Sequence, residues 1–408
     1  MKKRSPDAYT VFLIISFTGT IVFILVLLAT GGYGARWLAM ENNFDNFLTD
    51  HFRHIAFASD MQHFYFNTLD ATFPPFAYLL YYLLYRINPY SWAVNEWKES
   101  RDYQYNPLVY LMLAILFVLI FQLLVDKMLA KYDNVKNHLL VIAIVFSAPM
   151  MAGALERGNI SFLTALMLLG ALLLKDSDKA WKRETALFLI AAASGLKLYP
   201  AIFGFIYIVE KRYREGFRLL VYGLLVFFVP FAFCGGIPGL IQYLKILFFF
   251  ENQGYRSFTN IRNYLLSISD MLGMYERSAY FVKYFKIAEN LYLIFCLISM
   301  FKTKEKWKYA LYTSGIMAIY VPFSYRYTSV YMIIPLIMYL AQDKDRQKMI
   351  YSILFALIFT VPVYGIKTGL PADFYIFTPI YVMMIFSFIE DWIRNPSKVR
   401  KEKNPAQA

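Results

Sequence analysis

The sequence has little charge and almost no cysteine. Only 17% of its 408 residues are Asp, Glu, Lys or Arg, whereas soluble domains carry about 25%. The two cysteines, Cys234 and Cys296, both lie inside apolar blocks, which excludes a disulfide scaffold and a four-cysteine zinc site. The H-E-x-x-H, Walker A and G-x-S-x-G patterns are also missing. We therefore expect no metal ion, no cofactor and no hydrolysis of a cytosolic nucleotide.

Apolar residues dominate the chain instead. Hydrophobic side chains make up 59% of it and aromatic ones 19%, with a mean hydropathy of +0.44. They come in blocks of roughly 15–22 residues, the length that crosses a bilayer as a helix. These features predict an all-α polytopic membrane protein, a single integral membrane domain over residues 1–408. About twelve spans are expected, near 9–30, 73–87, 107–125, 138–154, 159–174, 184–209, 217–234, 286–301, 308–323, 328–341, 348–366 and 374–392.

Short basic runs between the apolar blocks set the expected orientation. The net charge of +13 is concentrated in these runs, which fits the positive-inside rule better than nucleic-acid binding. The rule places both termini in the cytoplasm, with a basic tail at 394–408. Alternating spans then put two large loops outside, 31–72 and 235–285, and these form the soluble surface where chemistry is expected.

One conflict in this topology stays open. Simple alternation also places the lysine-bearing segments 126–137 and 175–183 outside, against the charge rule. Keeping both inside requires that 73–87 does not cross and that 184–209 folds as a hairpin. Each arm of that hairpin would have about 12 residues, too short for a hydrocarbon core about 30 Å thick.

The first outer loop contains a helical pattern. Its apolar residues recur at the spacing of one helical face, at Phe44, Phe47, Leu48, Phe52 and Ile55. This spacing predicts an interfacial helix that lies with its apolar face on the membrane. Asp45 falls on the polar face, and with Asn43 as the cap the helix dipole favours its ionised form. A plain solvated face would produce the same pattern.

Lys197 is the most informative single residue. It interrupts the apolar run 186–209, so it lies at depth in either topology. Placing a lysine near the bilayer centre costs about 2.5–3.5 kcal/mol, and a nearby anion would offset that cost. The alternative is that the long side chain reaches back to the interface.

Three further sites carry polar residues that suit a ligand. Glu156, Arg157 and Asn159 stand at the junction of two apolar blocks, and Arg326 lies in a very short outer turn between aromatic residues. The planar guanidinium of arginine suits phosphate oxygens. Arg256 belongs to the long loop, whose aromatic and amide side chains suit sugars. A solvated turn, an interfacial anchor and an aromatic belt are the ordinary explanations of the three sites.

Taken in order, these features resemble the GT-C superfamily of membrane glycosyltransferases, specifically the polyprenol-phosphate-mannose-dependent glycosyltransferase family 87. The likeness extends from about residue 9 to residue 340, and its best local matches are Gly158-Asn159 and the run Gly195-Leu196-Lys197-Leu198-Tyr199-Pro200. The family junction usually reads Gly-Gln-x-Asn and its late turn Ser-Trp-x-His-His. Here they read Glu156-Arg157-Gly158-Asn159 and Ser324-Tyr325-Arg326-Tyr327, so we expect Arg326 to replace the histidines as a phosphate partner.

The resemblance implies a GT-C-like helical bundle and a hexosyltransferase. Such an enzyme takes a sugar, with mannose as the first candidate, from a polyprenyl phosphate to a glycan or glycolipid acceptor at the outer face of the cell membrane. It inverts the sugar without a metal, and Asp45 matches the position of the catalytic base. Lys197 and Arg326 would bind the donor phosphate. The other residues expected to contact substrate are Asp50, Glu156, Arg157, Asn159, Tyr199, Tyr325 and Arg256.

Two other functions fit the same composition. A transporter or flippase of polyprenyl-linked glycans would use the same buried cations without needing Asp45. An O-antigen-type polymerase or ligase would combine a large outer loop with a lipid-diphosphate donor. Within the first outer loop, Asp50, Asp60 and Asp70 remain alternatives to Asp45 as the base.

Overall fold

The computed structural model describes residues 7–32, 48–87, 108–252, 260–320, 326–360 and 372–392. Within these ranges the chain is helical and has no strand, so the expected all-α class is confirmed. The helices, in chain order, are α1 (Ala8–Ala29), α2 (Thr49–Ala58), α3 (Phe64–Asn67), α4 (Pro75–Ile87), α5 (Leu108–Met128), α6 (Asn134–Val145), η5 (Met150–Leu155), α7 (Ser161–Leu174), α8 (Ala180–Leu196), η6 (Tyr199–Gly204), α9 (Phe205–Val209), α10 (Tyr213–Phe228), η7 (Val229–Ala232), α11 (Gly236–Asn252), α12 (Ile261–Met271), α13 (Tyr275–Lys302), α14 (Lys306–Ile319), η8 (Arg326–Met332), α15 (Ile333–Ala341), η9 (Lys344–Arg346), α16 (Met349–Phe359) and α17 (Ala372–Trp392).

Several helices suit a membrane by length and composition. In the described ranges five are long and apolar enough to cross one: Ala8–Ala29, Leu108–Met128, Tyr213–Ala232, Tyr284–Lys302 and Phe374–Trp392. On α5, Leu111, Ile115 and Leu119 are exposed, as expected where the surroundings are lipid. Other apolar helices are shorter. The 14 residues of α7 extend only about 21 Å, so the expected count of about twelve spans is not confirmed.

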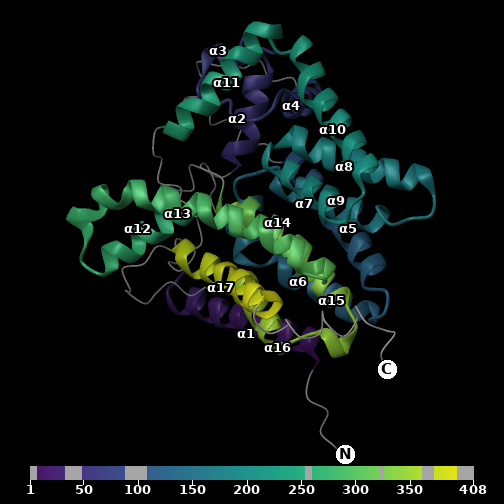
Figure 1. Ribbon diagram of the computed structural model, residues 1–408, viewed down its shortest axis with the longest axis vertical. Helices are drawn as coiled ribbons and strands as arrows, with labels where there is room; N and C mark the ends of the chain where they lie inside the picture. Colours follow the sequence, from purple (N-terminus) through teal and green to yellow (C-terminus); the bar gives the residue numbers. More distant parts are fainter. Residues whose placement is uncertain are drawn as a thin grey trace, which may run out of the picture.

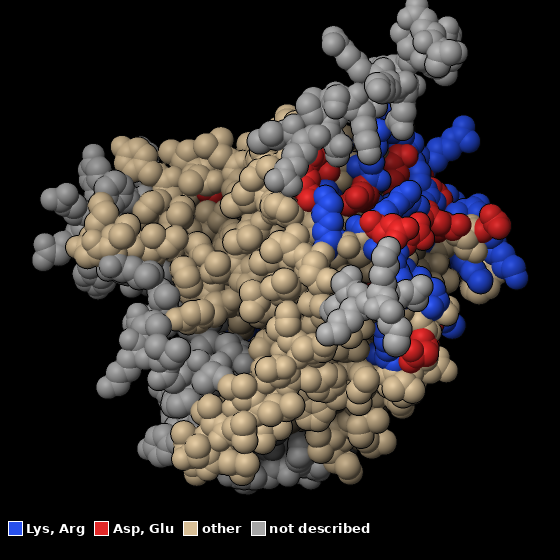
Figure 2. All heavy atoms as spheres, turned by 90° about the horizontal axis from the view of Figure 1, so that it is seen from below, with Lys and Arg blue, Asp and Glu red and all other residues tan. Residues whose placement is uncertain are grey.

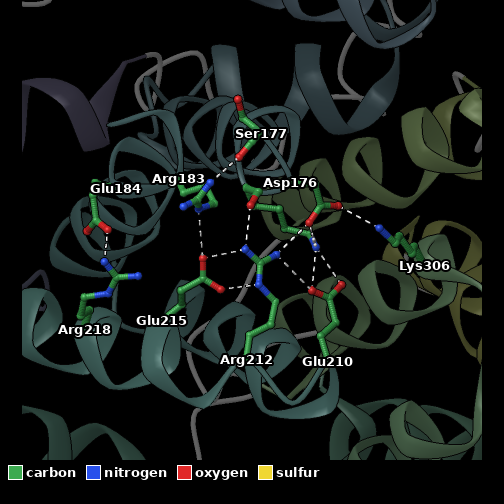
Figure 3. Close-up of polar contacts among 10 residues, drawn as sticks. Asp176, Ser177, Arg183, Glu184, Glu210, Arg212, Glu215, Arg218 and Lys306 are labelled. Carbon is green, nitrogen blue, oxygen red and sulfur yellow. Dashed lines mark hydrogen bonds and ion pairs between the residues drawn. The ribbon is translucent and has the colours of Figure 1, made fainter. Parts of the chain in front are cut away.

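Charged side chains gather at one end of the molecule, on the right of Figure 2. At this charged end, Lys175 Nζ lies 2.7 Å from Glu210 Oε1, and Arg212 Nη1 lies 2.7 Å from Asp176 Oδ1. Lys306 Nζ reaches the other oxygen of Asp176 at 2.8 Å from the start of α14 (Figure 3). The ends of α7 and α9 and the starts of α10 and α14 are therefore tied together here.

These ion pairs decide the topology of residues 184–209. Lys175 follows α7 and Glu210 follows α9, so the chain between them leaves the charged end and returns to it. The outgoing arm, α8, has 17 residues, or about 25 Å. The return runs through η6 and α9, of 6 and 5 residues. The segment is a hairpin with Lys197 at its tip, as the charge rule required.

The segment between α5 and α6 also lies at the charged end. Lys136 Nζ is 3.3 Å and Lys344 Nζ 3.6 Å from Asp7 Oδ2, next to the start of α1. α1 begins and α5 ends at this end, so the two helices run in opposite directions relative to it. α4 lies between them in the chain, and its 13 residues extend only about 20 Å. Both lysine-bearing segments therefore lie at the same, charged end of the molecule.

The two expected outer loops are largely helical where they are described. The first contains α2 and α3, and the second contains α11, α12 and the start of α13. α2 begins at Thr49, after Leu48 in a left-handed conformation with φ 56°. Phe52 and Ile55 are each 4% exposed and belong to a protein core that includes α4 side chains. For Leu48, Phe52 and Ile55 the prediction that the apolar face lies on the membrane is therefore wrong, because they are buried in protein against α4, while Asn43, Phe44 and Phe47 lie outside the described residues.

The helices are arranged so that α7 lies in the middle of the molecule. In Figure 1, α2, α3 and α11 are at the top and α1, α16 and α17 at the bottom. α7 packs against α5, α8 and η8, and its Ser161 and Thr164 are fully buried. The first turn of α7 and the tip of the α8–α9 hairpin meet far from the charged end, and the candidate site lies there.

Candidate active site

The first turn of α2 is held against the junction that precedes α7. Leu48 N–H donates to Glu156 O at 2.6 Å, and Asp50 N–H donates to Arg157 O at 3.0 Å. The helix start therefore finds partners for N–H groups that have none within the helix. Gly158 has φ +65°, and a Cβ there would stand 2.6 Å from His51 Cβ. Glycine is required at this position because both the backbone angle and the close approach of α2 exclude a side chain.

Asp50 is the anionic centre of the site. Arg157 Nη2 donates to Asp50 Oδ1 at 2.9 Å, and Asn159 Nδ2 donates to Asp50 Oδ2 at 2.7 Å. Burial by itself would raise the pKa of this carboxyl, but the Arg157 guanidinium and the Asn159 amide hold the pKa below its ordinary value. Asp50 is therefore ionised at neutral pH and fixed in position.

Lys197 approaches the same asparagine from the hairpin tip. α8 ends at Leu196, and Lys197 is extended, with φ −147° and ψ 138°. Its Nζ donates to Asn159 Oδ1 at 2.6 Å and to Ser161 Oγ at 2.9 Å. Lys197 is 3% exposed. In the described part of the chain, no carboxylate lies within ion-pair distance of its ammonium. Both of these acceptors are neutral.

Aromatic rings enclose the Lys197 ammonium. The ring centroids of Tyr327, Phe73 and Tyr199 lie 4.4, 5.1 and 5.5 Å from Nζ, within the range of cation–π attraction. Tyr327 comes from η8, whose backbone is so close to η5 that a Cβ on Gly153 would stand 3.0 Å from Tyr327 Cα. Arg326, the neighbour of Tyr327, is buried at the start of η8. The late turn and the hairpin tip therefore meet, as the candidate residues require.

The structure brings together four of the residues expected from sequence: Asp50, Arg157, Asn159 and Lys197. Tyr199 contributes its ring, and Glu156 contributes its backbone carbonyl to Leu48. Asp60 pairs with His63, and Asp70 lies 3.4 Å from Arg53, so neither is part of this chain of contacts. Asp45, Arg256 and Tyr325 lie outside the described residues.

Two comparisons find nothing, since no curated protein and no solved structure matches the chain. The model of glycosyltransferase family 87 matches residues 71–322, which is more than half of the 408 residues. The chain belongs to glycosyltransferase family 87. As a member, it is a membrane glycosyltransferase and uses a sugar donor and an acceptor. The matched segment contains the junction at Asn159 and the hairpin with Lys197.

An apolar cavity of about 620 Å³ lies beside the site of this family 87 glycosyltransferase. It is formed by α8, η6, α9 and α10, and Gly195 and Leu198 on either side of Lys197 are among its lining residues. From α10, Phe217, Leu220 and Leu224 also line it and are exposed on their helix. The cavity therefore joins the lipid-facing surface of α10 to the hairpin tip.

The sequence did not point to every residue of the site. Ser161 holds both Lys197 and Asn159, with its Oγ donating to Asn159 Oδ1 at 2.7 Å. The spacing Asn159-x-Ser161 at the start of a buried helix was an available signal. Phe73 and Tyr327 had no local signal, because each belongs to the site only through packing. Among the described residues, no group of three or more His, Cys, Asp or Glu side chains is placed to hold a metal ion.

Two histidines of α2 are buried beside Asp50. Burial lowers the pKa of His51 to about 4 and that of His54 to about 3. The Asp50 carboxylate opposes this effect at His54, but it is the smaller influence. The His54 ring is stacked on Phe73 with centroids 4.0 Å apart, and its Nδ1 lies 3.1 Å from Tyr78 Oη. Both imidazoles are uncharged at neutral pH.

Acidification from pH 7 to pH 5 is expected to lower the free energy of unfolding by about 2 kcal/mol for each of these histidines. Unfolding returns each pKa to about 6.5, so the unfolded chain binds more protons than the folded one below that pH. The stabilisation is complete above pH 6.5 and is lost as the pH falls towards the folded values of about 4 and 3. Thermal unfolding at pH 7, 6 and 5 measures this loss, and His54→Phe should make the dependence shallower. An equally steep dependence in that variant would contradict the assignment.

Proposed function

We propose that the protein transfers a hexose, with mannose as the first candidate, from a polyprenyl-phosphate donor to a glycan or glycolipid acceptor at the outer face of the cell membrane. The observation that carries this proposal is the buried Lys197 ammonium beside an apolar cavity. A cation with neutral partners favours an anionic ligand, and the adjoining apolar space favours a lipid. A lipid phosphate has both features in one molecule.

The electrostatic part of the proposal rests on the partners of Lys197. Placing a charged lysine deep in a membrane costs about 2.5–3.5 kcal/mol of free energy. The neutral oxygens of Asn159 and Ser161 offset only part of this cost. A phosphate next to Nζ would supply the missing negative charge. When the sugar leaves, that charge grows, so the same ammonium stabilises the transition state more than the ground state. Arg326, buried beside Tyr327, is proposed as the second cation on the phosphate.

The lipid part of the proposal rests on the cavity between the hairpin and α10. Its volume of about 620 Å³ is in the range of ligand sites, roughly 300–1,000 Å³. Its lining includes Gly216 and Gly223, whose missing side chains leave space along α10. An isoprenoid chain in this cavity would hold its phosphate at Gly195 and Leu198, next to Lys197.

The proposed base is Asp45, and Asp50 is proposed as an anchor. Both oxygens of Asp50 already accept hydrogen bonds, and its low pKa makes it a poor proton acceptor. Asp45 precedes Leu48 by three residues, a reach of at most about 11 Å, and Leu48 is bonded to the junction at Glu156. A single carboxylate takes the proton of the acceptor hydroxyl, which attacks the sugar from the side opposite the departing phosphate. This attack inverts the configuration of the anomeric carbon. No acid is needed, because the phosphate leaves without a proton.

The proposed orientation follows from the charged end. Basic loops stay on the cytoplasmic side, so the termini would be cytoplasmic. The hairpin tip is one α8 length away, about 25 Å, so the site would open towards the outer leaflet. A lipid-linked donor and a glycolipid acceptor would both be available there.

A transfer assay in liposomes tests the proposal. Purified protein is given a polyprenyl-phosphate mannose and a set of glycolipid acceptors, and the product and its anomeric configuration are measured. We expect an inverted product, formed equally well with EDTA present. A product of retained configuration would contradict the single-base mechanism, and loss of activity in EDTA would contradict metal independence. Movement of intact lipid-linked glycan between leaflets without cleavage would favour the flippase instead.

Filling the apolar cavity should weaken binding of the donor tail. A Cβ added to Gly223 meets nothing within 4 Å, so Gly223→Leu starts a side chain into open space and also improves helix propensity. We expect KM for a long-chain donor to rise about tenfold, as for a loss of about 1.4 kcal/mol in binding, with little change for a short-chain donor. Val221→Leu, on the same helix outside the cavity lining, is the control. Equal KM values for Gly223→Leu and wild type would place the tail elsewhere.

A further inference from the structure

Buried tyrosines pack around α2, and three of them have hydrogen-bonded hydroxyls. Tyr65 Oη donates to Phe73 O at 2.8 Å, and Tyr110 Oη donates to Leu155 O at 3.0 Å. Tyr78 Oη is paired with His54 Nδ1 at 3.1 Å. Tyr81 is different, because its hydroxyl has no hydrogen-bond partner among the described residues although the side chain is fully buried. An unpaired hydroxyl in the protein interior is unfavourable and calls for a reason.

The Tyr81 ring is held in place on several sides. It is stacked on His54 with centroids 5.3 Å apart and an interplanar angle of 29°, and it lies nearly parallel to Phe73 at 6.3 Å. His51 meets its edge at 6.3 Å. With neighbours on these sides, the hydroxyl cannot swing away to find a partner elsewhere. Tyr81, which belongs to α4, is therefore held against the first turns of α2.

A second unpaired hydroxyl belongs to Thr49, the first residue of α2. Thr49 is 7% exposed, and its Oγ1 has no partner. The next residue is Asp50, whose carboxylate uses one lone pair of each oxygen on Arg157 and Asn159. An ionised carboxylate has about four acceptor sites, so further donors can still bind it. Burial first, and the Asp50 charge after it, raise the pKa of Tyr81, which keeps its hydroxyl protonated, and its ring contacts His51, the neighbour of Asp50.

We propose that Thr49, Tyr81 and the remaining lone pairs of Asp50 form a subsite for sugar hydroxyl groups. The inference rests on the proposed transfer function and adds to it the residues that bind the hydroxyl groups of the sugar. Each protein hydroxyl can donate one hydrogen bond and accept two. The hydroxyl groups of a pyranose do the same, so the two kinds of group can pair in either direction. A site built this way rejects an analogue that lacks the contacted hydroxyl, because its own buried groups then stay unpaired.

Tyr81→Phe is the cleanest test, since it removes only the unpaired oxygen. We expect kcat/KM for transfer to fall at least tenfold while the unfolding temperature in detergent stays the same or rises. A structural role for the hydroxyl predicts the opposite, a lower unfolding temperature with unchanged transfer per folded molecule. Wild-type kcat/KM in Tyr81→Phe overturns the proposal.

Tyr243→Phe is the matched control. Tyr243 is also fully buried with an unpaired hydroxyl, but it lies on α11 against Tyr65 and Phe231. The chemical change and the burial are the same, but the Tyr81 ring packs against His51 and His54 of α2 and the Tyr243 ring does not. We expect wild-type transfer from this variant. An equal loss in both variants would attribute the effect of Tyr81→Phe to repacking, and overturns the proposal.

Deoxy analogues identify which sugar, that of the donor or that of the acceptor, the subsite binds. In wild type, one deoxy analogue of either the donor hexose or the acceptor should lose at least tenfold in kcat/KM, and Tyr81→Phe should abolish that penalty. If the penalty disappears for a donor analogue, the subsite binds the donor sugar; if it disappears for an acceptor analogue, the subsite binds the acceptor. Equal penalties for every donor and acceptor analogue in wild type and variant overturn the subsite.

A binding measurement separates this proposal from the transfer function. Thermal stabilisation by the mannose-bearing lipid and by the acceptor is compared between wild type and Tyr81→Phe, without turnover. If wild type binds and transfers nothing, and Tyr81→Phe weakens that binding, the subsite stands and the transfer function fails. If Tyr81→Phe binds as tightly as wild type, the subsite is wrong whatever the activity.

Discussion

Replacing Lys197 with methionine is expected to lower kcat/KM for the lipid-phosphate donor by about 10²–10³-fold, the usual effect of removing one group that stabilises a developing oxyanion. Methionine keeps the length of the side chain and removes its charge. Folding should be retained, because Ser161 still donates to Asn159 Oδ1 and a buried charge is no longer present. Initial rates over a range of donor concentrations measure the effect. Lys197→Arg should not restore activity, because Tyr327 and Phe73 already enclose the smaller ammonium.

Lys175 supplies the control for this variant. It is buried to the same degree, 3% exposed, but it is paired with Glu210 and Asp176 at the charged end. Lys175→Met should therefore lower stability, since it leaves Glu210 without this partner, and should change kcat/KM per folded molecule very little. If Lys197→Met keeps kcat/KM within threefold of wild type, the phosphate assignment is wrong.

Asp45→Asn and Asp50→Asn are expected to fail in different ways. Loss of the proposed base at Asp45 should lower kcat by about 10²–10⁴-fold, with KM for the donor and the unfolding temperature unchanged. Asp50→Asn removes the negative partner of Arg157 and should cost about 3 kcal/mol of stability, as for other broken buried pairs. Steady-state kinetics and thermal unfolding of both variants measure the two effects.

The reverse outcome would change the assignment. If Asp50→Asn kept its stability and lost kcat while Asp45→Asn remained active, Asp50 would be the base and Arg157 would serve to orient it. If both variants lost only stability, neither carboxylate would be the proton acceptor. Asp70→Asn is a suitable control, because Asp70 is paired with Arg53 and has no hydrogen bond to Asp50, Asn159 or Lys197.

The sequence predicted the chemical identity of the site better than its surroundings. Lys197 was singled out because a charge within an apolar run is costly, and that cost holds in any topology. Asn159 and Asp50 were named as substrate contacts, and the structure places both in one hydrogen-bonded chain with Lys197. The resemblance to family 87 is confirmed by the match over residues 71–322.

The topology was harder to predict for a physical reason. Apolar length alone cannot distinguish one long span from two short arms, because both bury similar residues. The hairpin is decided by the contact between Lys175 and Glu210, residues 35 apart in sequence. Likewise, helical periodicity predicted an apolar face on α2 but not what covers it. Phe52 and Ile55 pack against the protein because α4 is there, which no local pattern records.

The shape of the α8–α9 hairpin has a consequence for how the protein enters a membrane. Both of its arms are rooted at the charged end, by Lys175 before α8 and by Glu210 after α9. With the charged end in the cytoplasm, as proposed, none of the ionic groups in that network would have to cross hydrocarbon during biosynthesis. Of the cations in this segment only Lys197 would cross, and its hydrogen-bond acceptors, Asn159 and Ser161, lie at the start of α7. In that orientation a single positive charge of this segment would reach the far leaflet, while its other cations would stay on the side where they were made.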